Sequence, residues 1–206
     1  MDASVGGDNC SENETGNGVA KTALRDQVLA ARRRRPLGEN ARAARDLAVT
    51  ALDWDVVRRA ATVAAYVSVG SEPGTGLLLD ALVAAGKRVI LPVLLPDNDL
   101  DWAVYSGSTS LVRAPRGLFE PVGARLGVEA VRTADVVLVP GLAASPEGDR
   151  LGRGGGSYDR ALARVPDQTP VAIVLYDDEV GPAVPTDPHD VRVAFALTAG
   201  GVVALG

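Results

Sequence analysis

The chain has 206 residues, of which 47% are hydrophobic and 23% are charged, and its formal net charge is −5. These values are typical of a globular protein with an apolar core, and they argue against binding to nucleic acid or anionic lipid through an overall basic surface. The single cysteine, Cys10, excludes an internal disulfide, so we expect a protein of the reducing cytoplasm. The longest apolar runs, such as VVLVPGLAA, are too short to span a bilayer.

The start of the chain differs in composition from the rest. Residues 1–19 are polar and rich in Gly, without the basic start and apolar centre of a signal peptide, so we predict a disordered tail there. We assign residues 20–206 to one domain. Within it, the spacing of apolar residues predicts a helix over residues 21–34 and a second helix over residues 40–52.

Short β-branched runs alternate with helical patterns along the rest of the chain. Residues 62–69 predict a buried strand, residues 75–85 a helix that ends at Gly86, and residues 87–93 the next strand. Such a unit pairs its strands in parallel through a right-handed crossover. The remaining expected elements are an edge strand at 101–105, a turn or short helix at 128–131, strands at 136–139 and 171–175, a helix at 157–165, and closing strands at 195–198 and 202–205. We therefore predict a single α/β domain with a mostly parallel central sheet flanked by helices.

One segment, RLGRGGGSYDR at residues 150–160, places four glycines beside Arg150 and Arg153. Glycine lets backbone N–H groups approach a phosphate without a Cβ in the way, and the arginines add charge and forked donors. The helix predicted from Ser157 adds its positive dipole end. The pattern therefore indicates phosphate binding, although it is neither a P-loop nor the dinucleotide motif. Spacing alone leaves a flexible connection open, with Asp159 as a helix-start charge instead of a metal ligand.

Four segments carry a resemblance to a known family. VLVPGLAASPEGDRLGRGGGSYDR at residues 137–160 resembles the signature of the 5-formyltetrahydrofolate cyclo-ligase family, also called 5,10-methenyltetrahydrofolate synthetases. KTALR at 21–25 is similar to the family's K-x-x-L-R, SVGSEPGT at 68–75 to its E-x-x-T segment, and PTDPHDVRV at 185–193 to its late P-x-x-x-x-D element. The segments follow one another in the family's order.

The resemblance implies an enzyme that uses ATP and Mg²⁺ to convert 5-formyltetrahydrofolate (folinate) to 5,10-methenyltetrahydrofolate, ADP and phosphate. In that family the formyl oxygen attacks the γ-phosphate, and N10 of the folate then closes the ring as phosphate leaves. Catalysis of this kind depends mainly on positioning and on charge stabilisation around phosphate. We expect a cytoplasmic monomer with this small-molecule substrate and with neither a nucleic-acid nor a membrane partner.

On the ATP side, the resemblance implies that Lys21 and Arg25, one helical turn apart, face the phosphates, and that Lys21 and Arg153 are catalytic. Without the resemblance, the first pair also fits a solvated helix face. The implied ATP loop consists of Arg150, Leu151, Gly152, Arg153, Gly154, Gly155, Gly156, Ser157 and Tyr158, of which residues 153–157 also border the folate.

On the folate side, the resemblance implies that Glu72 hydrogen-bonds the pterin, since a carboxylate suits adjacent N–H donors, and that Val67 lines the substrate site. It implies that Asp159 and Asp190 hold Mg²⁺. The residues by themselves leave plainer alternatives open. Val67 also fits the core of a strand, Glu72 fits a loop charge, and Asp190 fits a turn that follows Pro188.

The chain departs from the family pattern at several positions. Ser157 replaces the first tyrosine of Y-Y-D, Gly155 stands where many members have lysine, and Ala194 stands where many have a second aspartate. Ala143–Ser145 replaces the usual A-F-D. These departures bear on rate and folate affinity more than on the class of reaction.

Two rival interpretations come from other classes of protein. One is a family relative that binds folate or nucleotide without turnover, which binding without phosphate release would reveal. The other uses the arginine run at residues 32–35 to bind nucleic acid. Because the net charge is −5 and no aromatic residues interleave the run, we interpret it as a solvated or ATP-facing helix end.

Overall fold

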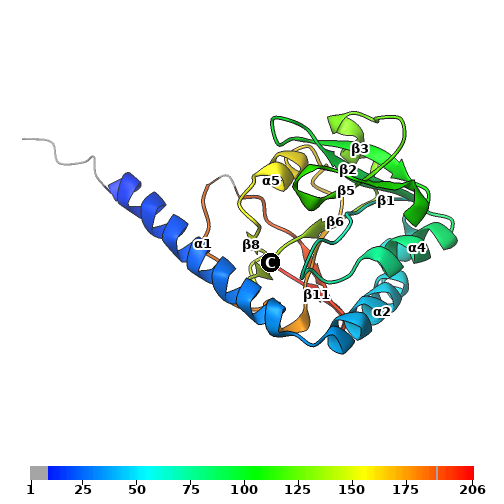
Figure 1. Ribbon diagram of the computed structural model, residues 1–206. Coiled ribbons are helices and arrows are strands. Elements are labelled where there is room, and N and C mark those ends of the chain that lie inside the picture. The colour runs from blue at the N-terminus through cyan, green and yellow to red at the C-terminus, as the bar shows by residue number, and fades with distance from the viewer. Residues whose placement is uncertain (1–8, 189) are drawn as a thin grey trace, which may run out of the picture.

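The computed structural model describes residues 9–188 and 190–206, and its centre is a seven-stranded sheet (Figure 1). The strands lie in the order β11-β10-β9-β6-β1-β2-β3. Their bounds are β1 Thr62–Ala64, β2 Arg88–Leu94, β3 Leu100–Tyr105, β6 Val136–Pro140, β9 Val171–Val174, β10 Phe195–Leu197 and β11 Val202–Ala204. The inner strands pair in parallel, and only the edge strands β3 and β11 are antiparallel to their neighbours. This confirms the prediction of a mostly parallel sheet.

The helices and short elements surround this sheet. The α-helices are α1 Asn9–Arg34, α2 Leu37–Asp53, α3 Asp55–Arg59, α4 Gly76–Ala84 and α5 Ser157–Leu162, and the 3₁₀ turns are η1 Ser108–Ser110, η2 Pro115–Gly117, η3 Val128–Thr133 and η4 Asp177–Glu179. Two small hairpins pair β4 (Leu111–Arg113) with β5 (Phe119–Pro121) and β7 (Ala143–Ala144) with β8 (Arg150–Leu151). The sequence patterns did not predict α3 or either hairpin, since each is too short to show a period.

The structure differs from prediction at two boundaries that matter for function. Helix α1 begins at Asn9, inside the stretch predicted as a tail, while residues 1–8 lie outside the described part of the chain. Strand β1 ends at Ala64, although a strand over 62–69 was predicted. Beyond it, the Thr75 hydroxyl donates to the Tyr66 carbonyl (2.8 Å) and accepts from the Ser68 N–H (2.8 Å). These side-chain bonds replace the strand ladder and turn the chain away from the sheet.

The core lies on both faces of the sheet. Alternate residues of β6 illustrate this, since Leu138 packs in the cluster with α2 and α4, while Val137 and Val139 pack in the cluster with α5 and η3. This alternation is the normal consequence of the pleat of a strand. Burial on both faces explains why the sequence of β6 is apolar without interruption. No helix in residues 9–188 and 190–206 has both the length and the apolar character to cross a membrane.

Helix α1 runs along the outside of the domain past β8 (Figure 1), and a buried ion pair attaches its end to η4. Arg32 is only 2% exposed, and its Nε and Nη2 donate to the two carboxylate oxygens of Glu179, each at 2.7 Å. Its Nη2 also donates to the Gly141 carbonyl (2.8 Å). The interpretation of the arginine run as a solvated or ATP-facing helix end is therefore wrong for Arg32. A forked guanidinium can pair with a carboxylate inside the protein, which a residue pattern does not reveal.

We predict that Arg32→Ala lowers the free energy of unfolding by about 3–5 kcal/mol, because it leaves the Glu179 carboxylate buried and unpaired. Urea denaturation followed by circular dichroism measures this change. Arg58→Ala is the control, because Arg58 and its partner Asp55 are both 61% exposed, and an exposed pair contributes about 1 kcal/mol or less. An equal loss of unfolding free energy in the two variants would contradict the conclusion that Arg32 anchors α1.

Candidate active site

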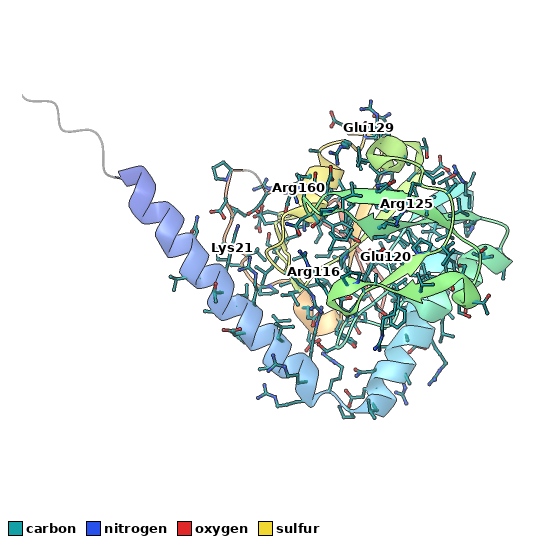
Figure 2. The ribbon with its side chains drawn as sticks, turned by 45° about the horizontal axis from the view of Figure 1, so that its top comes forward. Lys21, Arg116, Glu120, Arg125, Glu129 and Arg160 are labelled. Carbon is teal, nitrogen blue, oxygen red and sulfur yellow. The ribbon has the colours of Figure 1, made fainter. Side chains whose placement is uncertain are left out.

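A cavity of about 410 Å³ lies at the carboxyl ends of β1, β2 and β6, where ligands of parallel sheets bind. Its walls come from three parts of the chain: the segments after β1 and β6, the β3–β5 region, and the glycine loop before α5. In Figure 2, Arg116 and Glu120 lie on the β4–β5 side of this region, and Lys21 lies on the side of α1 that faces the domain. Most of the residues predicted for the site meet here.

The structure places the predicted residues in two groups. The cavity wall contains Val67, Glu72, Arg150, Gly152, Arg153, Gly154, Gly155, Gly156, Ser157, Tyr158 and Asp159. The other predicted residues, Lys21, Arg25, Leu151 and Asp190, are not part of this wall. Leu151 is 1% exposed and packs against Val28 and Leu142, so its side chain supports the loop from the core side and cannot reach a ligand in the cavity.

The glycine loop, residues 152–156, connects β8 to α5 and is held by α1. Gly154 and Gly156 have φ values of 90° and 67°, which favour glycine. The Arg25 Nε donates to the Gly152 carbonyl (2.9 Å), and a Cβ on Gly154 would lie 3.5 Å from the Arg25 guanidinium. Arg25 therefore fixes the path of the loop in this structure, a role that the sequence did not suggest.

Two predicted residues from different binding roles contact each other. Arg153 Nε donates to Glu72 Oε1 (3.0 Å), while the other oxygen of Glu72 accepts from the Val69 N–H (2.8 Å). The Glu72 side chain is 7% exposed, whereas that of Arg153 is 52% exposed. The buried carboxylate is therefore oriented by the backbone, and the half-exposed arginine pairs with it at the cavity wall. This contact brings the predicted folate residue and the predicted ATP loop together.

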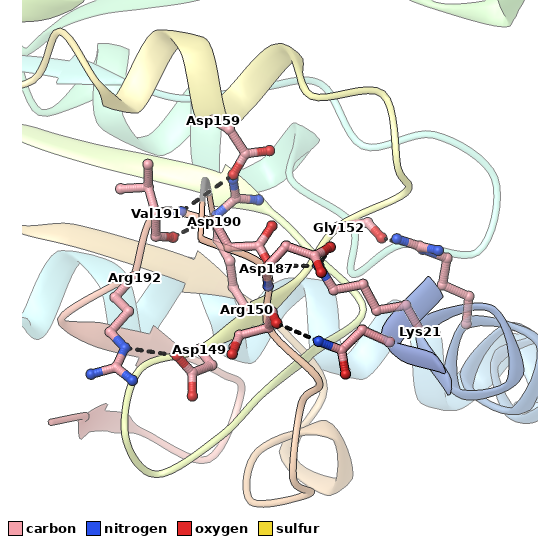
Figure 3. Close-up of polar contacts among 12 residues, drawn as sticks. Lys21, Asp149, Arg150, Gly152, Asp159, Asp187, Asp190, Val191 and Arg192 are labelled. Atoms are coloured by element: carbon pink, nitrogen blue, oxygen red, sulfur yellow. Dashed lines mark hydrogen bonds and ion pairs between the residues drawn. The ribbon is translucent and has the colours of Figure 1, made fainter. Parts of the chain in front are cut away.

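The two predicted metal ligands are each paired with a cation (Figure 3). Arg150 Nη2 donates to Asp159, and its Nε donates to the Val191 carbonyl (3.2 Å). Lys21 Nζ donates to Asp190 (2.5 Å) and to Asp187 (2.6 Å). The Val191 N–H points at Asp159 Oδ1 (3.5 Å), so the loop that carries Asp190 lies against the start of α5.

Lys21 remains charged in this setting. Burial lowers the pKa of Lys21, but the hydrogen bonds to Asp187 and Asp190 outweigh this effect, so the pKa lies above its usual value. Asp187 is a second partner of Lys21 that the sequence analysis did not identify. Its position in the same PTDPHD segment as Asp190 was the available signal.

Mg²⁺ can be tested against these donors. Within residues 9–188 and 190–206, no group of three or more His, Cys, Asp or Glu side chains forms a metal-binding cluster. A complete protein cage for a metal is therefore lacking in the described chain. However, Mg²⁺ in phosphate sites usually takes one or two carboxylates and completes its shell with phosphate oxygens and water. Asp159 and Asp190 fit that second arrangement.

Comparison with known proteins identifies the family. Residues 17–199 match the model of the 5-formyltetrahydrofolate cyclo-ligase family. The chain belongs to this family. The 5-formyltetrahydrofolate cyclo-ligase of Mycolicibacterium smegmatis is 47% identical over 150 residues, which cover 70% of this chain and 77% of the relative. The cyclo-ligase of Escherichia coli is 37% identical over 113 residues, which cover 54% of this chain and 62% of the relative.

Solved structures of the family share the fold. The 5,10-methenyltetrahydrofolate synthetase of Aquifex aeolicus superposes with a TM-score of 0.77 and 29% identity, over 90% of this chain and 92% of its own. The synthetase of Mycoplasma pneumoniae superposes with a TM-score of 0.67 over 87% of this chain and 98% of its own, and at 20% identity it shows the fold alone. The resemblance drawn from the sequence motifs is confirmed.

We predict that Gly154→Ala raises the KM for ATP several-fold and lowers the free energy of unfolding by about 1–2 kcal/mol, because the left-handed backbone disfavours a Cβ. Gly155→Ala is the matched control in the same loop. A Cβ there meets only Ser157 Oγ at 3.7 Å, without a left-handed φ, so its effect should be small. ATP titrations and thermal melts of both variants test this, and equal behaviour of the pair would refute it.

Proposed function

We propose that this protein converts 5-formyltetrahydrofolate to 5,10-methenyltetrahydrofolate with consumption of ATP. The main support is that Arg153 of the glycine loop contacts Glu72 within one cavity, in a chain that belongs to the cyclo-ligase family. A phosphate-binding loop and a carboxylate suited to a pterin are the two sites that this reaction must bring together. The structural fit of both in one cavity supports the proposal.

The chemistry requires that one oxygen be phosphorylated and then expelled. The formyl oxygen of the substrate forms a bond to the γ-phosphorus as the bond from that phosphorus to the ADP oxygen breaks. N10 then attacks the activated carbon and loses its proton to solvent, the carbon–oxygen bond breaks, and phosphate leaves with the former formyl oxygen. Arg150, Arg153 and Lys21 supply positive charge for the phosphates, and in our proposal Lys21 and Arg153 act directly on the transferred group.

The remaining roles follow from position. Glu72 holds the pterin, and Val67 lines the substrate side of the cavity. Gly152 and its neighbours offer backbone N–H groups to phosphate, while Arg25 keeps the loop in place through the Gly152 carbonyl. Tyr158 stays protonated, because burial and the nearby Glu72 carboxylate raise its pKa well above its usual value. It can therefore donate a hydrogen bond but does not act as a base near neutral pH.

We also propose that Mg²⁺ takes part, with Asp159 and Asp190 as its protein ligands. When bound, Mg²⁺ neutralises phosphate charge during transfer. In our proposal, Arg150 and Lys21 give up part of their contacts with these carboxylates when nucleotide and metal enter, and turn toward the phosphates. We further propose that the protein acts as a monomer in the cytoplasm, where its lone Cys10 stays reduced.

The first test mixes the purified protein with ATP, Mg²⁺ and 5-formyltetrahydrofolate and follows the near-ultraviolet absorbance of the methenyl product. We expect an increase that needs both ATP and Mg²⁺, with one phosphate released for each product formed. Omission of ATP, and EDTA in place of Mg²⁺, are the controls. Folate binding by calorimetry without any product would instead support a relative that binds but does not turn over.

We predict that Arg153→Ala lowers kcat/KM by about 100- to 1,000-fold, because it removes a positioned donor from the transferred phosphate. The fold should survive, since the Arg153 side chain is half-exposed at the cavity mouth. Arg132→Ala serves as the control, because Arg132 pairs with Glu129 on the surface of η3 outside the cavity wall. Unchanged kinetics in a well-folded Arg153→Ala protein would remove Arg153 from the mechanism.

A further inference from the structure

The hydroxyl of Tyr66 is a polar group that the proposed roles leave unused. Tyr66 is 3% exposed, and its ring belongs to the apolar cluster between the sheet and helices α2 and α4. Its hydroxyl oxygen is buried and has no hydrogen-bond partner in the described chain. An unpaired buried hydroxyl is unfavourable, so its presence calls for an explanation.

Tyr66 is also part of the cavity wall, as is Glu72. Burial holds the pKa of Tyr66 well above its usual value, and the charge of Glu72 acts in the same direction. The group is therefore a neutral hydroxyl on a residue of the same cavity wall as the carboxylate assigned to the pterin. Its neighbour along the chain, Val67, lines the cavity as well.

The chemistry of a pterin edge suggests what this hydroxyl could bind. The Glu72 carboxylate has room for two adjacent N–H donors beyond its bonds to Val69 and Arg153, since an ionised carboxylate offers about four acceptor sites. The ring carbonyl beside those N–H groups accepts hydrogen bonds, and an ionised carboxylate has no hydrogen to donate to it. A neutral hydroxyl on the same cavity wall would supply the donor that is missing.

We propose that the Tyr66 hydroxyl is a substrate contact that donates a hydrogen bond to the ring carbonyl of the pterin while Glu72 accepts from the adjacent N–H groups. The inference rests on the proposed function, because it assigns an additional residue to the same folate site. It makes Tyr66 a determinant of specificity for rings that carry a carbonyl at this edge. A site with a buried donor discriminates against ligands that cannot pair with it.

The test is Tyr66→Phe, which removes only the hydroxyl. We expect the KM for 5-formyltetrahydrofolate, and its Kd by calorimetry without ATP, to rise about 10-fold, while the KM for ATP stays the same. The melting temperature should not fall, because the lost hydroxyl has no partner in the free protein. A hydroxyl with a purely structural role would instead leave both folate constants unchanged.

Tyr105→Phe is the matched control. Tyr105 is also 3% exposed, but it lies outside the cavity wall and its hydroxyl donates to Asp80 (2.7 Å). That variant should lose thermal stability and keep its folate constants. Folate constants that stay at the wild-type value in Tyr66→Phe would overturn the inference while leaving the enzyme assignment intact. If the wild-type protein neither binds nor converts 5-formyltetrahydrofolate, the proposed function itself fails.

Discussion

The buried pair between Arg32 and Glu179 is the interaction on which the rest of the site depends. Helix α1 lies outside the sheet, and this bidentate contact fixes its end against η4 and the Gly141 carbonyl. Because the helix is rigid, the position of Arg32 determines where Lys21 and Arg25 lie, two to three turns earlier. A charge buried without this partner would be costly, so the helix has a single favourable placement.

That placement explains the electrostatics of the cavity rim. Lys21, Arg25 and Arg150 each contact the glycine loop or the loop that carries Asp190, and every one of them has an oxygen acceptor in the free protein. The carboxylates keep the cations ordered before any ligand enters. In the proposed reaction, Lys21 and Arg150 would pair with phosphate oxygens, and Asp159 and Asp190 would hold Mg²⁺, which would neutralise part of the phosphate charge. This kind of preorganisation reduces the reorganisation needed during phosphoryl transfer.

The part of the cavity wall that we propose for folate depends on the early end of β1. Thr75 and Glu72 satisfy backbone groups of Tyr66, Ser68 and Val69 after the strand stops, which lets this segment form a cavity wall. A longer β1 would have directed these side chains alternately into the two faces of the core. The end of β1 at Ala64 therefore places both the unpaired hydroxyl of Tyr66 and the buried carboxylate of Glu72.

The succession of the main strands and helices along the chain, the mostly parallel sheet and the glycine loop at residues 150–160 could be predicted from the sequence, because periodicity and glycine content report local geometry. Motif order also determined the family. The burial of Arg32, the contact between Glu72 and Arg153, and the pairing of Asp187 with Lys21 became visible only in the folded protein. These depend on pairs of residues far apart in the chain. A charged residue has the same local pattern whether it faces solvent or a buried partner, so only the folded arrangement distinguishes the two.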